Sequence, residues 1–230
     1  MTRISSNVAH ILKAIPPHVT ILAAAKTQSL QAVLEAYQAG LRHFGHNYVQ
    51  EAQQMLPDVQ AEIEWHMIGH LQRNKVKQAL DLFSSIDSLD SQRLADELEK
   101  QAGAMNRLIP VMIEVNSGEE EAKTGVAPDV AMQLARSLIA LPHLRLVGIM
   151  TMGPRFGDPE DSRVYFKRTR QIYESIAALH IPGTELQYLS MGMSNDYLVA
   201  IEEGANMIRR CTAIFSQHCP SLTWSSPSNP

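Results

Sequence analysis

Lys26 is the first residue whose type and position could carry chemistry. It ends the apolar run TILAAA and is followed by the polar residues TQS. A free lysine has a pKa near 10.4, so only about one side chain in 2,500 is neutral at pH 7. Desolvation or a neighbouring cation, for which Arg209 is a candidate, would lower that pKa and allow Schiff-base chemistry with a carbonyl compound or a pyridoxal. The alternative is a lysine that extends from a strand end into solvent and does no chemistry.

Two turns near the C-terminal end have the composition of an anion site. The first turn, residues 190–195, reads SMGMSN; Gly192 permits an unusual backbone angle, and Ser194 offers a hydroxyl at the start of a helix. The second turn, residues 209–212, reads RRCT and opens a short helical stretch. Because amides and hydroxyls at helix N-termini bind phosphate, the two turns together predict a phosphate site. The alternative is that Ser194 and Thr212 are ordinary helix caps.

The sequence predicts no metal site. His66 and His70 are four residues apart, but they flank the end of a predicted strand and therefore do not share a helical face. The zinc motif HExxH is absent, and neither Cys211 nor Cys219 has a partner at the spacing of zinc ligands.

The elements that must position these residues alternate regularly along the chain. Ser29 is expected to cap a helix that stops at Gly40, and Asp90 or Ser91 opens another that ends at Gly103. A helical period runs over residues 129–140, and a further helix is expected before the first strand. Short apolar segments predict eight strands, at residues 20–25, 42–45, 63–68, 83–87, 108–115, 144–149, 186–190 and 206–210.

This alternation implies a parallel sheet, and eight strands in 230 residues favour a closed (β/α)8 TIM barrel with an additional N-terminal helix. An open, doubly wound sheet would carry a glycine fingerprint after its first strand, but that turn reads AAAKTQS. We expect one domain over residues 1–230. Barrels of this type place their sites at the carboxyl ends of the strands, so the residues that follow the strands should converge there. They are Lys26, His46, Asn47, Gly69, His70, Asp87, Asn116, residues 150–152, residues 190–194 and residues 209–212.

Composition excludes several classes of protein. The chain has 20 Lys and Arg against 24 Asp and Glu, a net charge of −4, which argues against a nonspecific nucleic-acid binder. Two cysteines cannot make a disulfide framework, which indicates a reducing compartment. No apolar run reaches the roughly 18 residues of a membrane span, and the first residues lack the features of a secretory signal. We therefore expect a cytoplasmic protein that engages neither nucleic acid nor membrane.

Several segments resemble one known family. They are ILAAAKT, FGHNYVQE, WHMIGHLQRNK, SIDS, GIMTMG, LSMGMSNDY and RRCTAIF, in the expected order over about residues 8–217. The chain is similar to the YggS/PROSC family of pyridoxal 5′-phosphate (PLP) homeostasis proteins, a single barrel like the N-terminal domain of bacterial alanine racemase. SMGMS and WHxIGHLQxNK are its specific signals; an isolated lysine would not be one.

The resemblance assigns roles at the strand ends. It implies that Lys26 holds PLP as a Schiff base and that Asn47 lies beside the cofactor. It also implies that Arg209 faces the pyridine nitrogen, where a guanidinium that stays protonated would make the ring a poorer electron sink. The resemblance also implies that the SMGMS turn and the backbone amides of the closing motif contact the phosphate. The remaining cofactor-binding residues that it implies are Ser190, Met191, Ser194, Cys211 and Thr212.

The chain departs from the family pattern at five positions. Ala25 stands where the family usually has serine, and His46 stands in the usual GENY motif. In the closing motif, Arg210 replaces an apolar residue, while Cys211 and Ser216 replace glycines. A Cβ at position 211 could obstruct the approach of a phosphate, which leads to the hypothesis that PLP affinity is weaker than is typical.

Three functions remain to be distinguished. The resemblance favours a non-catalytic PLP carrier in homeostasis, expected to be a monomer and a possible donor of PLP to apoenzymes. The alternative is a PLP-dependent amino-acid racemase, but the related racemases take a second base from a further domain, and only about twenty residues follow the eighth strand. A class I aldolase with Lys26 as its imine-forming residue is a third possibility, which the flanking motifs do not favour.

Overall fold

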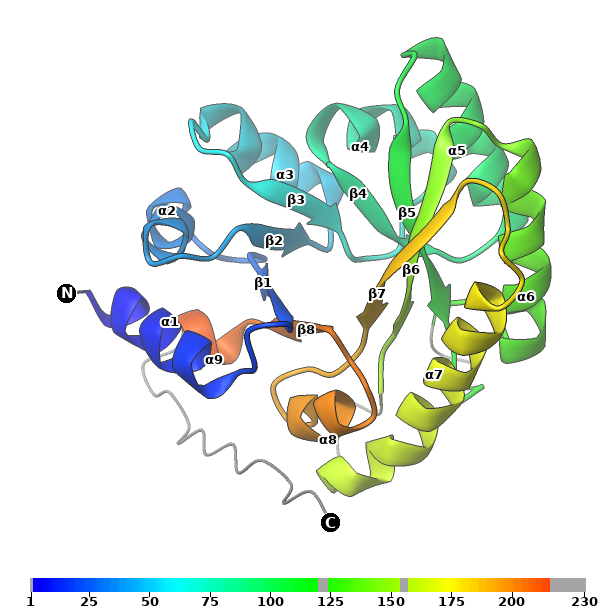
Figure 1. Ribbon diagram of the computed structural model, residues 1–230. Helices are drawn as coiled ribbons and strands as arrows, with labels where there is room; N and C mark the ends of the chain where they lie inside the picture. The colour runs from blue at the N-terminus through cyan, green and yellow to red at the C-terminus, as the bar shows by residue number, and fades with distance from the viewer. Residues whose placement is uncertain (1, 120–123, 154–156, 216–230) are drawn as a thin grey trace.

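Eight parallel strands close into a barrel in the computed structural model of this chain (Figure 1). The structure describes residues 2–119, 124–153 and 157–215. The strands follow one another around the barrel in chain order, and each predicted segment overlaps one of them. They are β1 (Thr20–Ala24), β2 (His43–His46), β3 (Glu64–Met67), β4 (Ser85–Leu89), β5 (Ile109–Val115), β6 (Leu144–Thr151), β7 (Thr184–Ser190) and β8 (Met207–Arg210). The predicted TIM barrel is confirmed.

Helices cover the outside of the strands, and the additional N-terminal helix is present (Figure 1). They are α1 (Arg3–Ala14), α2 (Leu30–Gln38), α3 (Val49–Met55), α4 (Val76–Leu82), α5 (Gln92–Ala104), α6 (Pro128–Ser137), α7 (Arg163–Ala177), α8 (Tyr197–Glu202) and α9 (Thr212–Phe215). Four 3-10 turns accompany them: η1 (Leu56–Asp58), η2 (Arg73–Lys75), η3 (Leu138–Ala140) and η4 (Pro159–Ser162). No helix among the described residues is both long enough and apolar enough to cross a membrane.

Local capping explains where two of these helices begin. The Ser29 hydroxyl accepts a hydrogen bond from the Ala32 amide, as predicted for α2. In α5 the cap is Ser91, which accepts from the Leu94 amide, rather than Asp90. The predicted helix over residues 129–140 is shorter as an α-helix, because its last three residues tighten into η3.

The core has two parts because side chains alternate between the two faces of each strand. The larger part fills the space between the strands and the surrounding helices. The smaller part lies inside the barrel and contains Leu22, Ala24, Ile68, Met112, Val147, Met150 and Met207. Four ionisable side chains are buried on the same inward faces of the strands, namely His66, Asp87, Glu114 and Arg209. The interior is therefore more polar than the aliphatic layers that usually fill such barrels.

Candidate functional site

Lys26 lies at the rim of the barrel, between the carboxyl ends of β2 and β8. The register pairs β1 with both neighbours, through Ala24 opposite Gly45 and Ala23 opposite Arg210. The chain turns away directly after Lys26, because Thr27 has a φ of 61° and its hydroxyl donates to the Lys26 carbonyl at 2.6 Å. The Lys26 side chain is exposed, so it is available to a ligand at the mouth.

Arg209 lies inside the same end of the barrel and is held by two other strands. Its Nη1 donates to the Ser190 carbonyl at 3.0 Å and to the Ser190 hydroxyl at 2.8 Å, while Nη2 donates to the Thr151 carbonyl at 2.6 Å. These bonds join the ends of β6, β7 and β8. Burial lowers the pKa of Arg209, and the nearby carboxylates, with Glu114 foremost, oppose that effect. The site thus contains a fixed cation whose donors are directed at strand ends.

Glu114 on β5 is a candidate site residue that was not among those expected from the sequence. It is buried, and burial raises its pKa, while the Thr124 hydroxyl, donating to Oε1 at 2.6 Å, and Arg209 both act in the opposite direction. A buried carboxylate beside a buried guanidinium offsets part of the desolvation penalty of each. The sequence contains a signal for this residue, because Glu114 is the one charged residue in the apolar strand segment LIPVMIEV.

The SMGMS turn is built on close backbone packing. Ser190 and Met191 are both buried, and the Met191 amide donates to the Met207 carbonyl at 3.1 Å. Gly192 has a φ of 90°, and a Cβ there would lie 2.5 Å from the Cβ of Ala200, so only glycine fits. Ser194 is exposed at the rim.

Ser194 does not cap the next helix, so that alternative is wrong. The helix α8 begins at Tyr197, its N-cap residue is Asp196, and the Asp196 carboxylate accepts from the Met193 amide at 2.7 Å. In the last turn Thr212 is the first residue of α9, and the Cys211 carbonyl accepts from the amides of Ile214 and Phe215. The first amides of a helix lack intrahelical acceptors, which makes this backbone a candidate anion contact.

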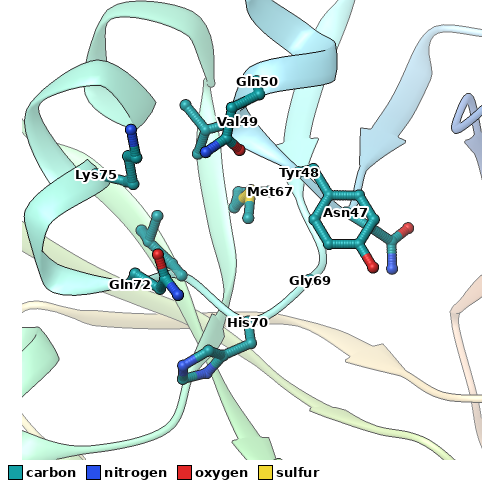
Figure 2. Close-up of a pocket in the computed structure, with 10 residues that line it drawn as sticks. Asn47, Tyr48, Val49, Gln50, Met67, Gly69, His70, Gln72 and Lys75 are labelled. Atoms are coloured by element: carbon teal, nitrogen blue, oxygen red, sulfur yellow. The ribbon is translucent and has the colours of Figure 1, made fainter.

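Asn47 follows β2 and is fixed by the neighbouring Gly69. A Cβ on Gly69 would lie 2.2 Å from the Asn47 carbonyl oxygen, so the glycine of the WHMIGHLQ segment allows the two backbones to approach. Asn47 also lines a pocket of about 330 Å³ between the ends of β2 and β3 and the helices that follow them. Figure 2 shows Gln50, His70, Gln72 and Lys75 around this pocket, with Asn47 and Tyr48 on one side.

Three of the departures from the family pattern have structural explanations. His46 is buried against Trp65, with ring centroids 5.4 Å apart, and burial lowers its pKa to about 4. Arg210 is also buried, and its guanidinium lies over the Tyr197 ring, 4.0 Å from the centroid. Cys211 packs on both parts of the core, and burial raises the pKa of its thiol, with Lys26 opposing. Ser216 lies outside the described residues.

The structure therefore gathers the predicted cofactor-binding residues at one end of the barrel. The expectation that Asp87 lies there is wrong, because β4 runs to Leu89 and Asp87 contacts His66 within the barrel. Arg209 and Ser190 are in direct contact. Lys26 and Cys211 follow neighbouring strands, and Lys26 is close enough to influence the Cys211 thiol. Asn47 follows the strand on the other side of Lys26.

Comparison with known proteins gives consistent matches. The family model for the N-terminal domain of alanine racemase matches residues 1–217. A pyridoxal phosphate homeostasis protein of Aquifex aeolicus is 40% identical over 200 residues, which cover 86% of each chain. The protein of that name from Escherichia coli K12 is 36% identical over 205 residues, covering 87% of this chain and 86% of the relative.

Solved structures agree with these matches. PipY of Synechococcus elongatus, solved with PLP bound, superposes with a TM-score of 0.85 at 31% identity and covers 93% of this chain and 100% of its own. An alanine racemase of Clostridium difficile superposes with a TM-score of 0.80 over 95% of this chain and 56% of the racemase. At 12% identity, the racemase likeness concerns the fold alone.

Proposed function

Because the chain belongs to the family of pyridoxal phosphate homeostasis proteins, we propose that it binds PLP at the carboxyl ends of its strands and serves intracellular PLP homeostasis. The observation that carries this proposal is the placement of an exposed lysine, a buried arginine and a glycine turn around one mouth. PLP bound to PipY, a relative 31% identical over 93% of this chain, supports the same assignment.

The residues at the mouth fit the chemical groups of PLP. Lys26 supplies the amine for a Schiff base with the aldehyde, and its exposure leaves it accessible. Arg209 would supply donors for the pyridine nitrogen, and Asn47 would lie beside the ring. The bond from Arg209 to the Ser190 hydroxyl means that Ser190 also positions this guanidinium.

For the phosphate we propose the rim of the last two turns. The exposed Ser194 hydroxyl and the backbone amides of Cys211, which precedes α9, and of Thr212, its first residue, are the donors. Met191 contributes by fixing the turn, because its amide belongs to the bond between β7 and β8.

The same arrangement supports a non-catalytic role. When bound, PLP supplies an electron sink, whose strength depends on protonation of the pyridine nitrogen. A guanidinium is a donor only and does not stabilise that protonation as a carboxylate would. Three hydrogen bonds hold Arg209 at the mouth as such a donor. We therefore propose that the protein holds and releases PLP without turning over amino acids.

Amino-acid racemisation is the second candidate, and the shared fold with alanine racemase is the observation that favours it. Racemisation needs two bases, one for each face of the α-carbon, and Lys26 could be one of them. The experiment must therefore measure binding and turnover separately.

The test starts with titration of the purified chain with PLP, followed by absorbance and by borohydride reduction with peptide mass analysis. Wild type should gain the imine absorbance, and reduction should fix PLP to the peptide that contains Lys26. Lys26→Ala should lose both signals, whereas Lys100→Ala, on the exposed face of α5, should keep them. A wild-type chain that cannot be loaded with PLP would disprove the binding proposal. Turnover of alanine or serine enantiomers at ordinary enzymatic rates would disprove the non-catalytic one.

We further propose that the protein works as a cytoplasmic monomer that passes PLP to apoenzymes. Loaded protein mixed with a PLP-dependent apoenzyme should reactivate it faster than the same concentration of PLP released by dilution, and equal rates would argue against direct transfer. Gel filtration with light scattering should give the mass of one chain.

A further inference from the structure

A connected group of titratable side chains lies at the amino-terminal end of the barrel, opposite the Lys26 rim. His43 begins β2, and Glu64 begins β3 directly opposite it in the register. His66 follows two residues later on the same face of β3, and Asp87 lies on β4. The proposed PLP site uses none of these residues. Figure 1 shows β2, β3 and β4 side by side in the barrel wall.

The distances within this group are those of metal ligands. His43 Nδ1 lies 3.1 Å from His66 Nε2 and 3.5 Å from Glu64 Oε2, and the three ligand atoms lie within 4.8 Å of one another. Zinc binds imidazole nitrogen and carboxylate oxygen at about 2.0–2.2 Å, which in a tetrahedron separates neighbouring ligand atoms by roughly 3.4 Å. The Glu64 side chain, 61% exposed, has the freedom to close the longer separation.

Asp87 fixes the orientation that a metal requires of His66. Its Oδ2 accepts from His66 Nδ1 at 2.9 Å, and its Oδ1 accepts from the Ser85 hydroxyl at 2.6 Å. With the proton on Nδ1, neutral His66 directs the lone pair of Nε2 at His43. A carboxylate behind the ring of a ligating histidine is the usual outer partner in zinc sites.

The charges around the group also suit a divalent cation. Asp87 contacts His66 directly, and Glu64 Oε2 lies 3.5 Å from His43 Nδ1. Two carboxylates beside two imidazoles therefore create a negative site in which a divalent cation would be neutralised.

From this geometry we propose that His43, Glu64 and His66 bind a first-row divalent transition metal, with zinc as the expected ion. Imidazole and carboxylate ligands suit zinc, and copper or nickel would compete for the same set. Three protein ligands leave one position for water, which the partly exposed His43 and Glu64 connect to solvent. The proposal is independent of PLP binding, because the residues lie at the other end of the barrel.

The experiment uses the full chain after removal of metals with a chelator. Zinc is titrated at pH 8 against a chromophoric competitor, and bound metal is counted by elemental mass spectrometry. We expect one zinc per chain, with affinity falling as pH is lowered to 6, because protons compete for the imidazoles. Loss of an outer partner alone weakens zinc sites about 10–100-fold, so His43→Gln should weaken binding by about 100-fold or more.

Matched variants separate this site from other zinc sites. His143 also contacts a carboxylate, with Nδ1 2.7 Å from Glu99, and it directly precedes β6 at the same end of the barrel, so His143→Gln is the control and should bind zinc like wild type. Lys26→Ala should also bind zinc normally. Because His43 is part-exposed, His43→Gln should keep the fold, which circular dichroism checks; Glu64→Gln, at a more exposed position, is the second ligand variant. Absence of stoichiometric zinc in wild type, or unchanged affinity in both ligand variants, would overturn the proposal.

Discussion

His46 should make the fold sensitive to acid, and one substitution tests this. The ring is buried, and its two nitrogens have no hydrogen-bond partner among the described residues. Its Nδ1 lies 4.0 Å from Glu51 Oε2, which is too far for a hydrogen bond. Burial lowers the pKa of His46 from 6.5 to about 4, so the ring is neutral in the folded chain at pH 7.

The sign of the effect follows from proton linkage. Between pH 6.5 and pH 4 the unfolded chain binds a proton at His46 that the folded chain does not, so the free energy of unfolding falls as the pH falls. Integrated between pH 7.5 and pH 4.5, the contribution of His46 is about 2.5 kcal/mol of lost stability. That is a large share of the roughly 5–15 kcal/mol that stabilises a typical domain.

The assay is urea unfolding of the PLP-free chain at pH values from 7.5 to 4.5. His46→Leu has a similar volume, does not titrate and leaves no partner unsatisfied, so it should lose about 2.5 kcal/mol less than wild type over this range. His43, His66 and Glu114 also have altered pKa values, but they are present in both proteins and cancel in the difference. His46→Gln repeats the test with a polar side chain. Parallel pH profiles for wild type and both variants would refute the reasoning.

Three further predictions concern the mouth of the barrel. Arg209→Gln removes three hydrogen bonds from a charged donor to Ser190 and Thr151 and a positive charge that favours ionised Glu114, so thermal and urea unfolding should show a loss of about 3 kcal/mol or more; a loss under 1 kcal/mol would contradict the described bonds. Gly69→Ala forces a Cβ against the Asn47 backbone, and it should lower stability by about 1–3 kcal/mol and weaken PLP binding in the same titration; wild-type values for both would show that the close approach is not required. Cys211→Gly should bind PLP more tightly if the Cβ obstructs the phosphate, and equal affinities in spectroscopic titration would remove that hypothesis.

The sequence was sufficient for the fold because its signal repeats eight times. Each strand is a short apolar run bounded by turn residues, and an error at one boundary does not change the count. The largest shift is at β4, expected at residues 83–87 and found at Ser85–Leu89. Phe83 looks like a strand residue, but its amide donates to the Ala79 carbonyl at 2.9 Å and closes α4. Apolar character alone does not distinguish these two states.

The sequence predicted only the part of the site that follows from the barrel fold, namely which residues lie at the carboxyl ends of the strands. Strand ends converge in any barrel, which placed Lys26, Asn47 and the last two turns at one mouth. The bond between Arg209 and Ser190 depends on how β7 and β8 are aligned and on side-chain length, which a single sequence does not encode locally. The pair of His43 and His66 was missed for the same reason, since the two residues are 23 positions apart and meet across neighbouring strands.

The two ends of the barrel are separate in packing but share an electrostatic environment. Along β2 and β3 the inward positions pass from His43 and His66 to Gly45 and Ile68, and a Cβ on Gly45 would lie 2.8 Å from both Ile68 Cδ1 and Leu22 Cδ2. Glycine therefore lets two apolar side chains meet and form a layer between the amino-terminal group and the mouth.

Charged groups on the two sides of this apolar layer still interact, because the field of a buried carboxylate is poorly screened. Asp87 contacts His66 directly and also favours the protonated state of Arg209 at the mouth. A divalent cation beside His66 would offset part of the field of Asp87, which would leave Glu114 as the main carboxylate that balances Arg209. Burial disfavours the charge of Arg209, so Glu114 contributes the largest opposing interaction and stabilises the protonated guanidinium at the mouth of the barrel.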